Sequence, residues 1–287
     1  ASKGEGLGNQ FLGNIRETDA ILHVLRCFDN DNVVHVDGSV DPIRDKETID
    51  MELQLKDLET AEKKLDKVNR AARTGNKEAQ KEAAILQTVK EGLESGTSVR
   101  AIVIAEDDRT DYVKPLQFIT DKPVLYICNV DEGSAVSGNS YVEKVKAVVA
   151  NENAMVIVLA VGTEADITEL DTYEERQMFL EDLGLTEAGS AKMIRAAYSL
   201  LNLQTYFTAG EKEVRAWTVT RGATAPQPAG KIHTDFERGF IRAEEKSYED
   251  FVNCGGEHGA KEAGKLRLEG KDYIVQEGDV VHFRFNV

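Results

Sequence analysis

The stretch Val124-Leu125-Tyr126-Ile127-Cys128-Asn129-Val130-Asp131-Glu132 decides how the rest of the sequence is interpreted. Its first five residues are apolar, rich in β-branched and aromatic side chains, and preceded by Lys122-Pro123. A short apolar run of this kind, bounded by a turn signal, predicts a buried strand. Polar side chains take over at Asn129 and Glu132, so we expect them at the end of that strand.

The pattern Asn-x-x-acid after a buried strand is typical of domains that hold a purine base. The asparagine orders the loop, and the carboxylate accepts hydrogen bonds from the base. Here the acid is Glu132, one methylene longer than aspartate, and Val130 stands where such domains carry lysine. We interpret this pair as a site that fits guanine poorly. The same pattern also occurs in ordinary loop caps, so its weight depends on the surrounding sequence.

The matching phosphate-binding pattern would be Gly-x-x-x-x-Gly-Lys-Ser/Thr. Residues 1–287 contain one near match, which runs from Gly259 to Leu266. It fails because Leu266 has no hydroxyl for Mg²⁺, and because a Gly-rich loop precedes it instead of an apolar strand. We expect a short helix here that ends near a glycine. We predict no metal-ligand set in this chain, whose histidines show no metal-ligand spacing.

The composition is that of a soluble globular protein, with 41% hydrophobic and 30% charged residues among 287. That length gives room for two domains and an insert. No apolar run approaches a membrane span, no secretory signal is present, and the three cysteines are far apart. We therefore predict a cytoplasmic protein without a membrane partner. The chain begins with Ala1 and no methionine, so we expect further sequence upstream.

The negative charge is concentrated in the first part of the chain. The net charge is −16, yet residues 204–287 hold 12 lysine and arginine residues against 14 aspartate and glutamate residues. Residues 1–203 therefore carry most of the excess. An acidic balance argues against general nucleic-acid binding, but it leaves a basic face possible on the C-terminal part.

Strands that alternate with helices predict a parallel α/β sheet formed by residues 1–46 and 98–203. The predicted elements are strands at 20–28 (mostly buried), 124–128 and 155–160 and helices at 141–149, 169–183 and 187–201. Ligands of such sheets bind at the carboxyl ends of the strands. Asn129 and Gly162 follow consecutive strands, so we add Gly162 to the predicted base site.

Residues 47–97 and 204–287 follow other patterns. Apolar residues recur at near-heptad spacing from Ile49 to Leu93, with an interruption at Thr74-Gly75-Asn76. Two amphipathic helices joined by a glycine turn predict an inserted antiparallel coiled-coil hairpin. Short alternating strands and turns in residues 204–287 predict a small α+β domain with a mixed sheet.

With these pieces in place, the chain resembles the YchF or Obg-like ATPase family of P-loop NTPases over nearly its whole length. The matching blocks include Gly4–Phe11, Asn14–Ala20, Leu203–Gly210 and His233–Ala243. The resemblance implies an incomplete P-loop NTPase (Rossmann-like) domain with the inserted hairpin, and a TGS domain at 204–287. It implies that the P-loop, a switch threonine and an Asp-x-x-Gly motif lie upstream of Ala1.

The resemblance also implies a nucleotide-binding hydrolase that prefers ATP to GTP, uses Mg²⁺ and associates with the ribosome and its RNA. The base-binding residues would be Asn129, Val130, Glu132 and Gly162. We expect a monomer, and we expect this chain alone to be inactive because its phosphate-binding loop is missing. The family carries a hydrophobic residue where other GTPases have glutamine, so another group must orient the attacking water.

His35 is the catalytic candidate. It lies in a turn-flanked segment after a strand of the nucleotide domain, and a neutral imidazole can align water near neutral pH. The competing interpretation is a surface-loop histidine.

The predicted RNA contacts are Arg238, Arg242, Lys261, Lys265 and Arg267. Some of these side chains are instead expected to pair with neighbouring glutamates.

Two function classes remain after this reasoning. The first is an ATPase switch that binds ribosomes. The alternative is a non-catalytic RNA- or ribosome-docking module that acts through the TGS domain and the helical hairpin.

Overall fold

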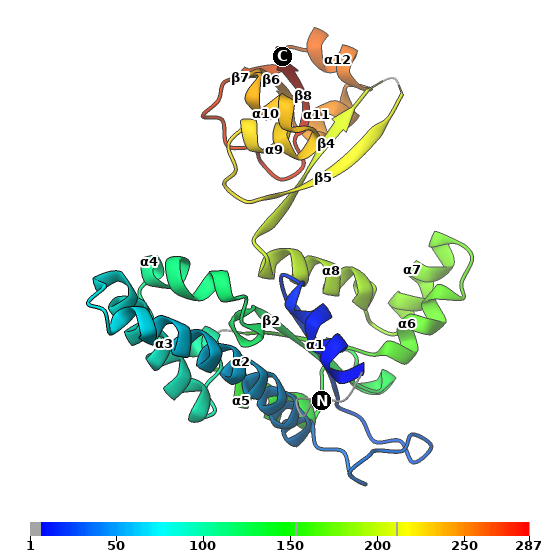
Figure 1. The fold of residues 1–287 in the computed structure, drawn as a ribbon. Helices are drawn as coiled ribbons and strands as arrows, with labels where there is room; N and C mark the ends of the chain where they lie inside the picture. The colour runs from blue at the N-terminus through cyan, green and yellow to red at the C-terminus, as the bar shows by residue number, and fades with distance from the viewer. Residues whose placement is uncertain (1–6, 153, 211, 287) are drawn as a thin grey trace. The chain divides into compact units, whose positions relative to one another are not determined.

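The computed structural model describes residues 7–152, 154–210 and 212–286 (Figure 1). The chain forms two compact units, which meet in the sequence at Ala197 and Tyr198. We call them unit 1 and unit 2 and describe each by itself. No helix in the described ranges has the length and apolar character needed to cross a membrane.

Unit 1 contains a parallel sheet, as the sequence predicts, and its strand order is β1-β2-β3. Its strands are β1 (Ile21–Arg26), β2 (Val124–Asn129) and β3 (Met155–Leu159). The register pairs Arg26 with Asn129 and Asn129 with Leu159. The three carboxyl ends therefore lie level with one another at one edge of the sheet.

The prediction of a mostly buried first strand is wrong for one face of β1. Leu22 is 40% exposed and Val24 57% exposed, whereas Leu25 and Cys27 are buried. β1 pairs only with β2 among the described strands. Since alternate side chains of a strand point to opposite faces, this pattern indicates that only one face of β1 packs against the core.

One core cluster of unit 1 lies between β2 and α5, where Tyr126 and Cys128 pack with Val142, Val145 and Val149. The helices outside the hairpin are α1 (Leu7–Arg16), α4 (Glu106–Asp108), α5 (Ser140–Val149), α6 (Val161–Thr168), α7 (Tyr173–Asp182) and α8 (Gly189–Leu200). Short 3-10 or π turns, η1 to η5, connect the elements between residues 99 and 134.

The helix predicted at 169–183 is confirmed as α7, but it begins later than predicted, and α6 was not predicted. α6 starts at Val161, directly after β3, and α7 starts only at Tyr173. The cause is a local capping box. Thr172 Oγ1 accepts the backbone N–H of Glu175 at 3.2 Å, while Glu175 Oε2 accepts that of Thr172 at 3.0 Å. This reciprocal pair begins a new helix at that point.

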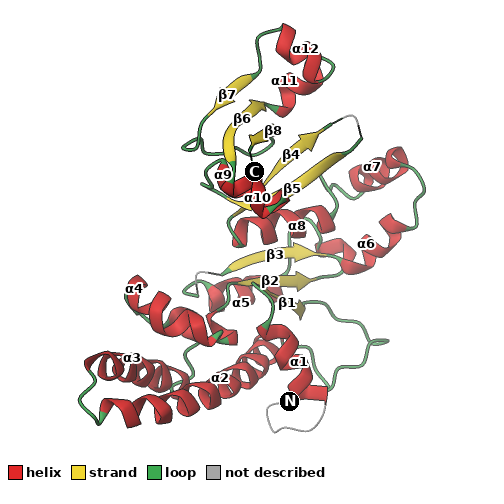
Figure 2. Ribbon diagram, turned by 45° about the horizontal axis from the view of Figure 1, so that its top comes forward, coloured by secondary structure: helices red, strands yellow, loops and turns green. Residues whose placement is uncertain are grey.

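Two long helices, α2 (Pro42–Ala72) and α3 (Lys77–Glu94), run side by side (Figure 2). Asp41 caps α2, which begins before the predicted Glu47, and Asn76 caps α3. Gly75 takes a positive φ of 87° in the turn between them, a conformation that glycine adopts without steric cost. Buried contacts join Leu65 and Val68 to Leu86. The coiled-coil geometry itself stays a prediction.

Unit 2 is an α+β structure with a mixed sheet, in the order β5-β4-β8-β6-β7. Only the β4–β8 pair is parallel among the described pairs. The strands are β4 (Leu203–Ala209), β5 (Val214–Thr220), β6 (Phe240–Lys246), β7 (Arg267–Glu269) and β8 (Val280–Phe285). The helices are α9 (Pro226–Ile232), α10 (Thr234–Arg238), α11 (Tyr248–Asn253) and α12 (Glu257–Glu262).

The near match to a phosphate-binding loop lies in α12 and the turn that follows it. Gly264 has a φ of 70° two residues after the helix ends. The expectation of a short helix that ends near a glycine is confirmed. The segment before α12 is the end of α11 and a glycine turn, with no strand.

Candidate functional site

A cavity of about 370 Å³ lies at the carboxyl ends of the three parallel strands. It includes the four residues predicted for base binding, Asn129, Val130, Glu132 and Gly162. The register explains why they meet: β2 ends at Asn129 and β3 at Leu159, and these two residues are paired. Strand pairing thus brings the segments that follow β2 and β3 to one edge of the sheet, where ligands of parallel sheets bind.

Asn129 ties the neighbouring chain segments together. Its Oδ1 accepts the Val161 N–H at 3.0 Å, at the start of α6. Its backbone carbonyl accepts the Cys27 N–H at 2.7 Å, on the β1 side. The side-chain Nδ2 makes no hydrogen bond within the described part of the chain. The amide oxygen therefore has a structural role, whereas the amide nitrogen keeps two N–H donors available for a ligand.

The next residues differ in exposure. Val130 is 3% exposed, and its N–H donates to Leu159 O at 3.0 Å. Glu132 is exposed at the start of η5 (Glu132–Ser134), and its carboxylate has no hydrogen bond or ion pair to other described residues. Asp131, by contrast, caps η5 by accepting the Ser134 N–H at 3.0 Å. Of these two acids, Glu132 is the one free to meet a ligand.

The part of the cavity wall that follows β3 contains Gly162 and Thr163. Gly162 lies in the first turn of α6, and a Cβ built there would meet no atom within 4 Å. Its neighbour Thr163 is 3% exposed, yet its Oγ1 has no hydrogen-bond partner within the described residues. Buried hydroxyl groups are usually hydrogen-bonded. The Thr163 hydroxyl is therefore a buried polar group of the cavity wall that lacks a hydrogen bond among the described residues.

The wall beside β1 contains residues that the sequence reasoning missed. These are Phe28, Asp29, Asn30 and Val33. The segment is fixed by α5, since Asn139 Nδ2 donates to Cys27 O at 2.7 Å and Tyr141 OH donates to Asp29 at 3.0 Å. The rule that selected Gly162 would have found them, because they directly follow a parallel strand.

His35 is held away from the cavity wall, which it does not line. Its Nε2 lies 2.8 Å from Asp45 Oδ2, and its Nδ1 accepts the Asp37 N–H at 3.1 Å. Because Nδ1 accepts, the proton of the neutral ring must be on Nε2, which donates to Asp45. Both ring nitrogens are therefore occupied, and the competing surface-loop interpretation of His35 stays open.

His35, Asp37 and Asp45 place one ligand atom each within 4.8 Å of one another, a spacing that a metal ion could use. However, Arg44 lies 3.5 Å from Asp37 and 3.2 Å from Asp45. The guanidinium already pairs with both carboxylates, and its positive charge opposes the binding of a cation there. We therefore assign no metal to this cluster.

Three of the five predicted RNA contacts are engaged in ion pairs within unit 2. Arg267 forms a bidentate pair with the buried Glu245 at 2.6 and 2.8 Å. Arg242 lies 3.3 Å from Glu244, and Lys265 lies 3.3 Å from Asp250. The expected pairing with glutamates is confirmed for Arg242 and Arg267, whereas Lys265 pairs with an aspartate.

Arg238 and Lys261 are exposed and have no ion pair with other described residues. They are the two predicted contacts whose charge is fully available.

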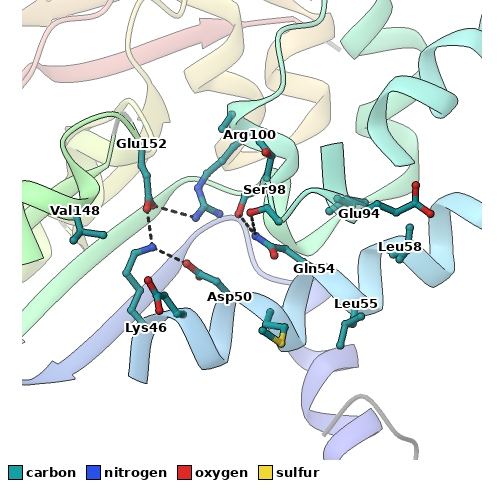
Figure 3. A pocket seen from close by; sticks show the side chains of 16 residues that line it. Lys46, Asp50, Gln54, Leu55, Leu58, Glu94, Ser98, Arg100, Val148 and Glu152 are labelled. Atoms are coloured by element: carbon teal, nitrogen blue, oxygen red, sulfur yellow. Dashed lines mark hydrogen bonds and ion pairs between the residues drawn. The ribbon is translucent and has the colours of Figure 1, made fainter. Parts of the chain in front are cut away.

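A larger cavity in unit 1, about 780 Å³, lies beside the hairpin (Figure 3). Lys46 Nζ lies 2.7 Å from both Asp50 and Glu152, and Arg100 lies 3.6 Å from Glu152. Burial alone would lower the pKa of Lys46, but its hydrogen bonds to the two carboxylates hold that pKa above its ordinary value. The two cations and two carboxylates of this cavity pair with one another. The smaller cavity around Asn129 is therefore the better candidate for a polar ligand.

The fold and site together define an α/β protein with a ligand-sized cavity at the carboxyl ends of a parallel sheet. A family model, YchF-GTPase_C, described as "Protein of unknown function (DUF933)", matches residues 203–286. The chain is 54% identical to a "Ribosome-binding ATPase YchF" from Haemophilus influenzae over 287 residues, all of this chain and 78% of that protein.

Other comparisons agree with this result. The chain is 55% identical to a protein of the same name from Bacillus subtilis, again over all of the chain and 78% of that protein. The structure of the Schizosaccharomyces pombe YchF GTPase superposes with a TM-score of 0.84 and 36% identity, covering 99% of this chain and 77% of that one. The chain belongs to the YchF family.

Proposed function

We propose that the cavity around Asn129 binds the base of a purine nucleotide, with ATP preferred over GTP. We further propose that the chain is part of a ribosome-associated ATPase switch. The observation that carries the base assignment is the convergence of Asn129, Val130, Glu132 and Gly162 on one cavity.

Asn129 supports purine binding of either kind. The Nδ2 group, which has no partner in the described structure, would donate to N7 of the base. N7 is an acceptor in both adenine and guanine. Asn129 therefore selects purines without choosing between them, and the choice falls to its neighbours. Thr163 also lines the cavity, with a buried hydroxyl that has no partner among the described residues.

Glu132 and Val130 would make that choice. Guanine presents N–H donors that an aspartate at this position meets in pairs, and the longer glutamate misplaces its carboxylate. Val130 is buried and apolar, so it lacks the long charged side chain that a lysine at this position would place along the base. A missing or misplaced pair of hydrogen bonds to guanine is worth roughly 1–3 kcal/mol, about one to two decades in affinity.

ATP also needs a phosphate cradle and Mg²⁺. Hydrolysis proceeds by positioning and charge neutralisation of the phosphates. Residues 1–287 contain no matching Gly-x-x-x-x-Gly-Lys-Ser/Thr loop, and the one metal-like cluster found among the described residues already pairs with the Arg44 guanidinium. The base fits this chain, whereas the phosphates and Mg²⁺ do not. We propose that these residues alone hydrolyse no ATP.

Ribosome association is supported by the printed names of the relatives, several of which are ribosome-binding ATPases. A ribosomal partner implies a cytoplasmic protein. Of the five predicted contacts, the exposed Arg238 and Lys261 are free to meet RNA phosphates, and Arg242, Lys265 and Arg267 would first have to leave their acidic partners.

The base assignment is tested in a chimera that carries the N-terminal segment of the Bacillus subtilis relative in front of residues 1–287. Calorimetry should show ATP binding at least about ten-fold tighter than GTP. The double substitution Val130→Lys/Glu132→Asp should narrow or reverse that ratio.

Asp131→Asn is the matched control, because Asp131 also lines the cavity but its carboxylate is engaged by Ser134 in capping η5, and it should keep the ATP preference. GTP binding equal to or tighter than ATP in the unsubstituted chimera would contradict the assignment.

A further inference from the structure

We propose that a second cavity, in unit 2, binds an unpaired nucleobase of single-stranded RNA. This inference rests on the proposed ribosome association and names the kind of ribosomal element that unit 2 would hold. The cavity measures about 580 Å³ and is lined by Trp217 of β5, Phe236 of α10, and Phe283 and Phe285 of β8. Its volume lies within the usual range of small-ligand sites.

The aromatic rings are already arranged in the way that bases stack. Phe236 and Phe285 lie face to face, with 3.8 Å between ring centroids and 24° between ring planes. Phe285 is 38% exposed, although the core of unit 2 packs tightly around Tyr206 and Phe240. A flat, partly exposed ring pair is a platform on which any base can stack, since every base has a π face.

Trp217 is held in a fixed orientation at the same cavity. Its Nε1–H donates to Thr208 Oγ1 at 2.9 Å. The Arg215 guanidinium lies 4.1 Å from its ring centre. Because both contacts fix the indole before any ligand arrives, little side-chain entropy is lost when a base stacks against it.

The charges around the cavity suit a nucleotide better than an apolar peptide. Lys212 lines it and Arg215 lies against Trp217, so two cations flank the rings, while Glu213 is the acidic residue in its wall. Cations next to aromatic faces are what a single-stranded nucleic acid requires for its phosphates and bases together. Residues 204–287 as a whole are near neutral, so charge alone would bind RNA weakly, and stacking must supply the rest.

Trp217 makes the proposal testable, because it is the single tryptophan of the chain. A hexa-adenylate single strand added to the full chain should quench Trp217 emission, whereas an RNA duplex of the same length should not. Phe236→Leu and Phe285→Leu remove the stacking faces and should each weaken oligomer binding about ten-fold. Phe285→Tyr keeps the ring and should retain binding.

Tyr248→Leu is the matched control. It removes an aromatic side chain of unit 2 that is 55% exposed and does not line the cavity, so it should bind as the unsubstituted chain does. Circular dichroism will report whether each variant is folded. If a Leu variant is not folded, Phe285→Tyr still tests whether the ring is needed.

Co-sedimentation with ribosomes separates this proposal from the function on which it rests. Two results would overturn the base site and leave ribosome association intact. The first is ribosome binding without quenching of Trp217 by the oligomer. The second is oligomer binding by both Leu variants that equals that of the unsubstituted chain. If the Leu variants lose ribosome binding and the unsubstituted chain does not bind the oligomer, the cavity contacts a ribosomal protein, which also overturns the base site. If neither ribosomes nor the oligomer bind, both proposals fall.

Discussion

At the scale of single residues, the structure separates groups that are committed to the fold from groups that are free. Asn129 uses its oxygen to hold α6 and keeps its amide donors free, and Glu132 is free where Asp131 is not. His35 is the opposite case, since both of its nitrogens are engaged. For His35 to align a water, its bond to Asp45 must first open, and the surrounding loop of turns and exposed side chains is suited to that change.

His35→Ala should lower the turnover of the chimera described above by about 10²-fold, while ATP affinity stays unchanged. A group that positions water acts mainly in the transition state, so kcat falls and binding does not. Steady-state kinetics and calorimetry together measure the two effects.

His233→Ala is a close control, because His233 Nδ1 also accepts the N–H of an aspartate two residues later, at 3.2 Å. An unchanged kcat in His35→Ala would return His35 to a surface-loop role.

At the scale of elements, one buried carboxylate joins the hairpin to the rest of unit 1. Asp57 of α2 is fully buried and accepts the backbone N–H groups of Ile119 and Thr120 at 2.9 and 2.7 Å. Burial raises the pKa of Asp57 even though these bonds favour its charged form. The carboxylate thus caps η4 (Ile119–Asp121) from another helix.

Asp57→Ala should destabilise unit 1 by about 2–5 kcal/mol, because two buried N–H groups would be left without an acceptor and each costs roughly 1–3 kcal/mol. Chemical denaturation followed by helical circular dichroism measures the destabilisation, and Trp217 emission reports unit 2 separately. Asp66→Ala, on the exposed side of the same helix, should change stability by no more than about 0.5 kcal/mol. Equal effects of the two substitutions would contradict the capping role.

The elements with local signals could be predicted from the sequence. The apolar run before Asn129 and the heptad-like spacing of residues 47–97 predicted a parallel sheet and two long helices, and the strand-end rule led to the cavity. Features that depend on distant partners could not be predicted in this way. Trp217 and Phe285 line one cavity only because β5, β4 and β8 are neighbours in the sheet, and Arg267 meets Glu245 only because β7 pairs with β6. The capping box at Thr172 was a local signal that could have been used.

At the scale of the whole molecule, the two units differ in charge, and this difference bears on ribosome binding. Residues 1–203 hold most of the excess negative charge, and residues 204–287 are close to neutral. RNA binding is therefore expected through unit 2, and it should weaken as salt increases, because each neutralised phosphate releases counterions.

Arg238→Glu/Lys261→Glu should weaken co-sedimentation with ribosomes and flatten the log–log salt slope by about 0.7–0.9 for each phosphate that is no longer neutralised. These two exposed side chains carry no ion pair within the described residues, so their reversal leaves the fold of unit 2 intact. Lys63→Glu/Lys67→Glu makes the same charge change on the exposed face of α2 and should have little effect. If the α2 pair weakens binding and the unit 2 pair does not, the hairpin is the docking element.

The side of β1 that faces away from β2 has a practical consequence for anyone who purifies this chain. That side pairs with no described strand, and Leu22 and Val24 add exposed apolar side chains. Such a strand is a template on which another chain can add a strand. Such growth is slow when the protein is dilute and accelerates as it is concentrated, for crystallisation trials or magnetic resonance samples. A lysine in place of Val24 would protect against it, because a charge on an edge strand makes sheet extension unfavourable.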